Sequence, residues 1–436
     1  MHAAMTETPS TAGAEPAPPS PAGGPLAGVR VADLSRVLAG PYATMLLADM
    51  GAEVVKVEHP GRGDDTRAWG PPHSGGEAAY YLAVNRGKRS LAVDVKDPEG
   101  RAAVQELCAR SDVVIQNFRP GVAERLGLGF DALRERNPAL VYCSISGFGP
   151  EHAPAGRPGF DVIVQAESGL MGVTGAPDGP GYKVGVAITD VLTGLNAAVG
   201  VLGALLRARA TGQGAHVEAT LVNSALSGLV NLAQQALVTG AEPPRMGNAH
   251  STIVPYQVFP TADADLVIAA GNDALFQKLC GALDRSDLAA DPRFGTNPDR
   301  VRHREVLVGE LTRTLRARPA AEWLKLLLAA GVPVGRVRGV LDAIRSADAA
   351  GDDVTVRVEH PTAGPLETVR AGFRLLADPA GAGAPAGPPL PPPLLGEHSV
   401  RLLRELGLPE ERIAGLIERG AVHQAAPPEP AAPERP

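Results

Sequence analysis

Short apolar runs alternate with stretches of helical spacing through the first third of the chain. The runs have the length of buried strands, and the stretches between them place apolar residues three and four positions apart. Five runs fit strands, at residues 29–35, 53–58, 90–95, 112–117 and 140–146. Such alternation predicts an α/β fold with a parallel sheet covered on both faces. Because ligands of these sheets bind outside the carboxyl ends of the strands, we expect a site where the five runs end.

Helices are expected at two places between these runs. The first follows residue 36 and ends at Gly51, and the second runs through about Ala109. Asp97 and Pro98 supply an N-cap and a first-turn proline for the second helix.

The middle of the chain has a different pattern. After Gly185 we expect a short strand and then an apolar helix that begins near Asp190 and ends before Gly212. A further strand leads into a buried helix, and a new unit begins at about Pro255. The elements expected from there on are a strand at 265–271, a helix capped by Asp273, helices at 302–315 and 320–330, an antiparallel pair at 354–361 and 366–370, and short helices within 397–419.

Three segments are too poor in large apolar side chains to offset the entropy of ordering them. We expect a disordered extension at residues 1–24, an extended Pro-rich connector at 377–393 and a disordered tail at 424–436. Translation could begin at Met1 or at Met5.

Composition narrows the class of protein. The 436 residues include 48 acidic and 41 basic side chains, and a net charge of −7 disfavours binding to nucleic acid or to an anionic membrane. Cys108, Cys143 and Cys280 are odd in number and far apart, which fits a reduced protein. The N-terminus lacks the pattern of a signal peptide, and no apolar run reaches the ~18 residues of a membrane span. We therefore expect a soluble cytoplasmic protein.

The chain lacks several common motifs of nucleotide-binding, hydrolytic and metal sites. No G-x-G-x-x-G joins the first strand to a helix, and neither a phosphate loop nor a G-x-S-x-G elbow occurs. The ten histidines are scattered without metal-ligand spacing, so no metal site is expected.

Five segments carry a family resemblance. In chain order they read GVRVADLSRVLAGPYATMLLADMGAEVVKVEHPGRGDDTR, NRGKRSLAVDVKDPEG, VVIQNFRPGVAERLGLG, VGVAITDVLTG and PPPLLGEHS. Together they resemble the class III CoA-transferases, which include formyl-CoA transferase, carnitine CoA-transferase and 2-methylacyl-CoA racemase. The segment RMGNAHSTIVPYQVF, followed by AAGND and LFQKLC, is similar to the branch that moves CoA between dicarboxylates such as succinate and glutarate.

The resemblance implies a domain organisation. A Rossmann-like large domain would bind CoA and comprise residues 25–215 and 341–423, and residues 216–340 would form a linker helix and a smaller inserted α+β domain. Two subunits would interlock as a homodimer. The CoA thioester would be a co-substrate, with no permanently bound cofactor.

The resemblance also implies that Asp190 is the nucleophile. A carboxylate is ionised at pH 7, can attack an acyl-CoA thioester, and can pass through a mixed anhydride and an aspartyl-CoA thioester. On local pattern alone, Asp190 is instead the N-cap of its helix, and a helix N-terminus would also favour the ionised form.

Binding residues follow by position from the family. The residues expected to contact CoA are Val37, Ala39, His59, Val93, Lys96, Asn117, Phe118 and Arg125. The residues expected at the acceptor acid are Leu38, Arg245, Gly247 and His250, and either Arg245 or His250 could bind a distal carboxylate, for which a guanidinium is suited. The segment 245–250 is equally compatible with an ordinary interdomain loop. Arg67, Trp69 and Tyr80 line the same region in relatives and are equally compatible with a structural role.

Two alternatives remain. Racemases of the family carry a histidine where this chain has Phe160, and phenylalanine can neither donate nor remove a proton, which disfavours a racemase. A non-catalytic acyl-CoA-binding protein with the same fold is disfavoured by the presence of Asp190.

Overall fold

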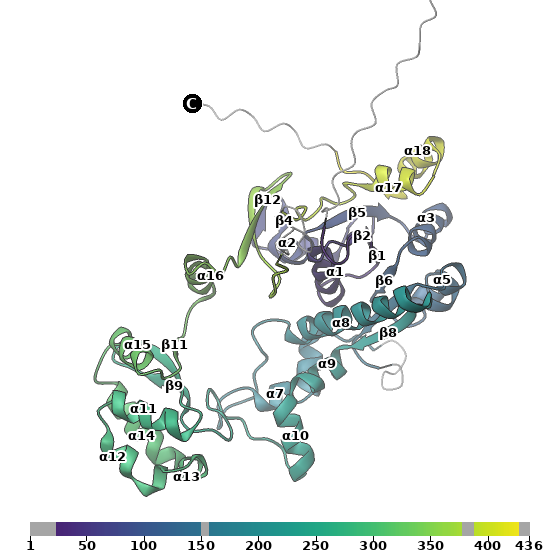
Figure 1. Cartoon of the computed structure of the whole chain (residues 1–436). Coiled ribbons are helices and arrows are strands. Elements are labelled where there is room, and N and C mark those ends of the chain that lie inside the picture. The colour runs from purple at the N-terminus through teal and green to yellow at the C-terminus, as the bar shows by residue number, and fades with distance from the viewer. Residues whose placement is uncertain (1–22, 150–156, 377–387, 427–436) are drawn as a thin grey trace, which may run out of the picture.

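A seven-stranded sheet organises the computed structural model, which describes residues 23–149, 157–376 and 388–426. The strand order is β14-β5-β2-β1-β6-β7-β8, and all neighbours are parallel except β14, which pairs antiparallel with β5 (Figure 1). The strands are β1 (Arg30–Asp33), β2 (Glu53–Glu58), β5 (Lys88–Val93), β6 (Val113–Gln116), β7 (Val141–Ser146), β8 (Ala215–Thr220) and β14 (Val422–His423). The five predicted strands and the predicted, mostly parallel α/β sheet are confirmed.

Both faces of the sheet are buried. Successive residues of each strand point to opposite sides, so neighbouring positions contribute to different cores. Val31 belongs to one core cluster and Ala32 to the other. The first cluster includes helices α1 (Ala39–Asp49) and α8 (Ile188–Thr211). The second includes α3 (Pro98–Ala109), α5 (Phe130–Arg136), α17 (Ser399–Glu405) and α18 (Glu410–Glu418). The last two helices return from the far end of the chain, so the sheet is built from both ends of the sequence.

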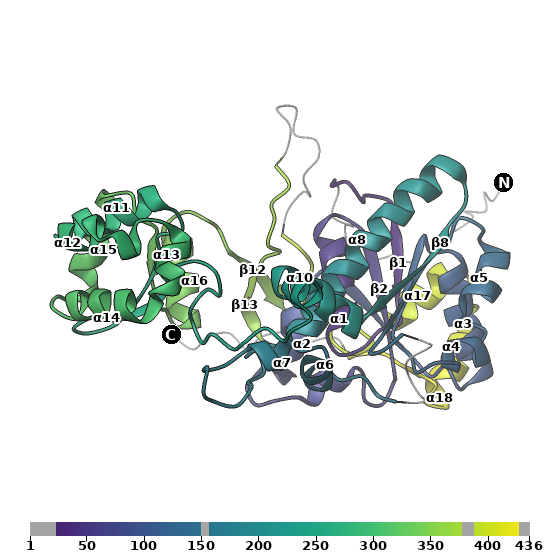
Figure 2. The same ribbon diagram turned by 90° about the horizontal axis from the view of Figure 1, so that it is seen from below.

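A second core lies around a three-stranded antiparallel sheet in the order β11-β10-β9. Its strands are β9 (Tyr256–Pro260), β10 (Asp265–Ala269) and β11 (Val334–Arg336), and its helices are α11 (Asp273–Ala282), α12 (Ser286–Ala290), α13 (Asn297–Arg302), α14 (Arg304–Leu315) and α15 (Ala320–Ala329), with the short turn η2 (Pro292–Phe294). This unit projects away from the large sheet (Figure 2). The N-cap of α11 is Asn272, whose side chain accepts from the Leu275 amide, so the prediction that Asp273 is the cap was one residue late.

The remaining elements connect these two parts. They are η1 (Asp65–Ala68), β3 (His73–Ser74), β4 (Glu77–Ala78), α2 (Ala79–Val84), α4 (Val122–Arg125), α6 (Asp161–Glu167), α7 (Leu170–Val173), α9 (Leu221–Gly228), α10 (Val230–Thr239), α16 (Val340–Ala349) and the antiparallel pair β12 (Thr355–His360) and β13 (Gly364–Val369). Most of the predicted extension, connector and tail lies outside the described residues. Within the connector, the Pro393 carbonyl accepts hydrogen bonds from Arg67 and Tyr81, and Gln424 in the tail bonds to Glu397 and Val400.

Helix α8 differs from the sequence expectation in two ways. No strand precedes it, because residues 186 and 187 lead directly into the helix. By length and hydropathy α8 could cross a membrane, with a mean hydropathy of 1.6, so the statement that no stretch reaches this length and character was wrong. The helix packs along the sheet and buries Ala197, Ala198 and Val201 against it, as a core helix of a globular fold does.

Candidate active site

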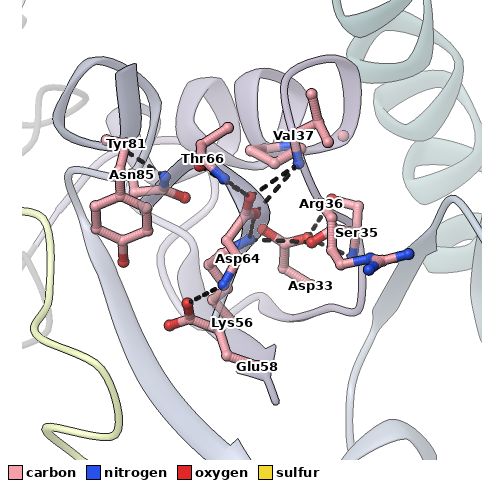
Figure 3. A network of polar contacts seen from close by, with 12 residues as sticks. Asp33, Ser35, Arg36, Val37, Lys56, Glu58, Asp64, Thr66, Tyr81 and Asn85 are labelled. Atoms are coloured by element: carbon pink, nitrogen blue, oxygen red, sulfur yellow. Dashed lines mark hydrogen bonds and ion pairs between the residues drawn. The ribbon is translucent and has the colours of Figure 1, made fainter. Parts of the chain in front are cut away.

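The turn between β1 and α1 lies at the carboxyl edge of the sheet, where a site was expected. Lys56 of β2 donates to the Ser35 carbonyl at 3.0 Å. The Asn117 side-chain amide accepts from the Arg36 amide at 2.9 Å and donates to the Arg36 carbonyl at 2.8 Å. Asp64 accepts from the Val37 amide, at 3.2 Å to each carboxylate oxygen (Figure 3). Val37 itself has φ +72°, a left-handed conformation that costs a β-branched residue about 1–2 kcal/mol.

Charged residues behind this turn are buried in pairs. Lys56 and Asp64 are 2.8 Å apart and Lys88 and Asp33 are 3.1 Å apart, and all four side chains are fully buried. Burial alone would raise the pKa of Asp64, but Lys56 and the hydrogen bonds from Thr66 lower it to about 2. Burial lowers the pKa of Lys88 to about 8, against the attraction of Asp33. Separating the partners of such a pair would leave an uncompensated charge in the protein interior. The pairs therefore resist movement of the turn that they contact.

A basic pocket of ≈ 580 Å³ opens on one side of the turn. Five residues predicted to contact CoA line it: His59, Val93, Lys96, Phe118 and Arg125. Arg62 also lines this pocket and was not predicted, although it lies in the loop that follows β2. Lys96, Arg125 and Arg62 are exposed cations that can pair with phosphate groups.

A cleft of ≈ 350 Å³ opens on the other side of the turn and contains Asp190. The predicted residues that line it are Val37, Leu38, Ala39, Asn117 and Phe118. Arg36 and Phe118 line both the basic pocket and this cleft, so the two cavities adjoin at the turn. Arg36, Arg119 and Arg157 add positive charge to the cleft; sequence reasoning missed them because nothing in the chain marks which surface arginines face the cavity.

Asp190 is the third residue of α8, and Ala187 is the N-cap. The interpretation of Asp190 as the cap was therefore wrong: in the part of the chain that the structure describes, no donor reaches its carboxylate. Burial, and secondly the negative charge of Asp161, raise the pKa of Asp190 to about 7. Both effects oppose the expectation that this carboxylate is fully ionised at pH 7.

Asp161 of α6 caps α8 from outside the helix. Its Oδ1 accepts from the Thr189 amide at 2.8 Å and from the Thr189 hydroxyl at 2.6 Å, while Oδ2 accepts from Gln165 at 2.7 Å. These bonds hold the first turn of α8 and so fix the backbone that carries Asp190. Asp161 directly follows Phe160 in the sequence, at the end of the segment RPGFD.

Aromatic and apolar residues lie near Asp190, in the lining of its cleft and in the small apolar cluster that includes Val191. Tyr80 stacks edge-on against Trp69 with ring centroids 5.3 Å apart, and burial, then the Asp190 charge, raise the pKa of Tyr80 to about 12. Phe160 is 57% exposed and lines the cleft without an acid or base function. Arg67 has a structural environment: it pairs with Glu58 and Glu77 at 2.8 Å each.

The residues expected at the acceptor acid are not all brought to the cleft. Leu38 lines it, whereas Arg245, Gly247 and His250 line none of the cavities described here in the single chain. The Arg245 guanidinium donates to the carbonyls of Gly172, Ala176 and Gly179. The Gly247 amide donates to Gly175, and the His250 ring packs against Tyr256.

No three His, Cys, Asp or Glu side chains converge as a metal site within the described residues. Among the residues that the structure describes, the site offers a carboxylate without a hydrogen-bond donor, a cleft lined by three arginines and three aspartates, and an adjoining basic pocket. This combination suits a nucleophile acting on a phosphate-bearing thioester.

Comparison with known proteins agrees with this class of site. The model of CoA-transferase family III matches residues 26–399, and the chain belongs to that family; it is a CoA-transferase. It is 39% identical over 401 residues to succinyl-CoA:glutarate CoA-transferase of Homo sapiens, covering 92% of this chain and 90% of the human protein. It is 42% identical over 394 residues to succinate–glutarate CoA-transferase of Agrobacterium fabrum, covering 88% and 96%.

A solved structure of a CAIB/BAIF family protein from Brucella suis has the same fold. The TM-score is 0.76 at 38% sequence identity, and the match covers 88% of this chain and all of the other.

Proposed function

We propose that the enzyme transfers CoA from succinyl-CoA to a dicarboxylic acid through covalent intermediates on Asp190. The observation that carries this proposal is the joining of the Asp190 cleft to the basic pocket at Arg36 and Phe118. CoA phosphates would bind to Lys96, Arg125 and Arg62, and the thioester end would pass Phe118 to reach Asp190. The relatives named for succinyl-CoA and glutarate support the choice of substrates.

The first half-reaction releases the donor acid. An Asp190 oxygen attacks the thioester carbonyl, the C–S bond breaks, and CoA leaves as a thiolate from a mixed anhydride. The thiolate then attacks the Asp190 acyl carbon, so succinate leaves as a carboxylate and an aspartyl-CoA thioester remains.

The second half-reaction reverses these steps with the acceptor. The acceptor carboxylate attacks the aspartyl thioester and CoA thiolate leaves; the thiolate then attacks the acceptor's acyl carbon and frees Asp190. Each bond formed replaces one of similar energy, so the chemistry requires exclusion of water more than a strong acid or base. The apolar side chains beside Asp190, including Leu38, Val37 and Tyr80, serve this purpose.

Two arginines in the cleft support an acceptor with two carboxylates. One carboxylate must react at Asp190, and a second needs a positive partner. Arg36 and Arg157 line the cleft together with Asp190; they pair with Asp65 and Glu167 in this structure, and a guanidinium can also bind a substrate carboxylate in a planar, two-point geometry.

The experiment follows labelled succinate into succinyl-CoA and traps the acyl-enzyme with hydroxylamine. Hydroxylamine attacks the aspartyl-CoA thioester and leaves a hydroxamate on residue 190, which mass spectrometry locates. Asp190→Asn should fold but lose roughly 10³-fold or more of its turnover, because an amide oxygen is a poor nucleophile.

Asp131→Asn is the matched control, since Asp131 also lies in the first turn of a helix but is exposed and lines neither cavity. It should retain activity. Pentanoate, which equals glutarate in length but lacks the second carboxylate, should be a poorer acceptor by at least tenfold. Normal exchange by Asp190→Asn would overturn the mechanism, and equal use of pentanoate would overturn the acceptor class.

A further inference from the structure

The turn at residues 35–37 is held by side chains from three other parts of the chain. Lys56 of β2 binds the Ser35 carbonyl, and Asp64 binds the Val37 amide (Figure 3). Asn117, which follows β6, binds both main-chain groups of Arg36. No residue of the turn is stabilised by regular secondary structure alone. The position of the turn is therefore set by these contacts.

Asp64 is the centre of this arrangement. Besides the Val37 amide, its carboxylate accepts from the Thr66 amide at 3.0 Å and the Thr66 hydroxyl at 2.8 Å. Lys56 contacts the same carboxylate at 2.8 Å and the Ser35 carbonyl at 3.0 Å, so the ion pair is tied to two residues of the turn. Asp64 is 1% exposed and Lys56 is fully buried.

The backbone of Val37 adopts a conformation that these contacts must hold in place. A β-branched residue avoids positive φ, and only an external constraint keeps it there. The Asp64 bond to the Val37 amide is such a constraint. Val37 and the following Leu38 line the cleft of Asp190, and both belong to the small apolar cluster that includes Tyr80 and Val191 of α8.

We propose that Asp64, supported by Lys56, is a positioning residue for CoA transfer: it holds Val37 in the left-handed conformation and thereby places Val37 and Leu38 against Asp190. This proposal rests on the proposed function, since it assigns a role within the same reaction. Asp64 acts through Val37 and needs no contact with substrate. A residue that served only the stability of the fold would have no reason to depend on Val37.

The test compares Asp64→Ala in two backgrounds, because alanine has no side-chain oxygen that could accept from the Val37 amide. Glycine adopts positive φ without steric cost, so Val37→Gly removes the need for the constraint. In the Val37 background, Asp64→Ala should lower kcat at least tenfold, whereas in the V37G background the same substitution should lower it less than threefold. Equal losses in both backgrounds would overturn the proposal.

A second variant covers the case in which Asp64→Ala leaves Lys56 unpaired and the protein does not fold. The double variant Lys56→Gln with Asp64→Ala removes both charges of the pair and should show the same dependence on Val37. Asp112→Ala is the matched control: Asp112 accepts the Arg30 amide at 2.8 Å, is exposed and lines neither cavity, and its loss should change kcat less than twofold.

A structural readout separates this proposal from the proposed function. A crystal structure of Asp64→Ala should show Val37 at negative φ, whatever residue is acylated during turnover. A retained positive φ would overturn the positioning role even if Asp190 is confirmed as the nucleophile. Failure of the hydroxylamine trap would overturn the assignment of Asp190 as the nucleophile. The φ of Val37 would then still decide whether Asp64 holds the turn.

Discussion

At the scale of single residues, the environment of Asp190 raises the pKa of its carboxyl group. Its carboxylate is placed among apolar groups and beside Asp161, so its pKa is raised to about 7 and part of the enzyme is protonated at neutral pH. A protonated carboxyl group is a poor nucleophile, but a carboxylate stripped of solvent is a reactive one. The site thus combines reactivity with a pH dependence that the residue type alone would not suggest.

If Asp190 is the nucleophile as proposed, the exchange rate should rise with pH through a midpoint near 7, because deprotonation of Asp190 would produce the attacking group. Asp161→Asn removes a like charge while its amide oxygen can still accept from Thr189, so the midpoint should move to lower pH by roughly half a unit to one unit. Succinate exchange measured from pH 5 to 9 gives both midpoints. Asp131→Asn should leave the midpoint unchanged, and an unmoved midpoint in Asp161→Asn would contradict the assignment.

At the scale of elements, the approach of α8 to α1 aligns the two halves of the cleft. A Cβ on Gly194 of α8 would lie 2.7 Å from the Ala39 carbonyl oxygen and 3.0 Å from the Tyr42 ring. Only glycine permits this contact, and Ala39 itself lines the cleft. The separation of the two helices is therefore set by one small residue a turn beyond Asp190.

Gly194→Ala should lower the free energy of unfolding by roughly 1–3 kcal/mol, because the backbone of α1 must shift to admit the methyl group. The shift should also reduce exchange activity. Gly309→Ala makes the same change inside α14, where nothing lies within 4 Å, and should be neutral or stabilise by up to ~1 kcal/mol. Denaturant unfolding gives the free energy of unfolding of both variants. Similar values for Gly194→Ala and Gly309→Ala would contradict this account of the contact between α8 and α1.

At the scale of the whole molecule, large apolar side chains remain uncovered on α8 and α10. Val199 and Leu206 of α8 are 69% and 71% exposed, and Leu237 and Val238 of α10 are 79% and 75% exposed. Such exposure of large apolar side chains is typical of a protein–protein interface. We propose a homodimer that covers these residues, in keeping with the expectation from the sequence.

Sedimentation of the protein should give about twice the mass of one chain, 44.9 kDa. The double substitution Leu206→Glu with Leu237→Glu should shift the mass toward one chain, since two charges would be buried unpaired. The exposed Glu418→Gln in α18, on the far side of the sheet from α8, is the control and should leave the mass unchanged. A wild-type protein that sediments as a single chain would contradict the homodimer.

The sequence alone determined five strands of the parallel sheet and the class of enzyme, whereas it did not predict β14. The strands follow from local periodicity and the class from motifs that keep their order along the chain, both of which can be recognised without coordinates. His59, Lys96 and Arg125 were expected from the family resemblance, and the structure places all three on one pocket.

Only the tertiary structure decided how Asp190 is held and charged. Its cap comes from Asp161, 29 positions earlier in the sequence, and its pKa depends on burial among side chains from α1, α2 and α8. The strain at Val37 likewise depends on Asp64, 27 positions later. Such contacts join positions far apart in the sequence, and the energy of each depends on geometry and solvent exclusion that exist only once the chain has folded.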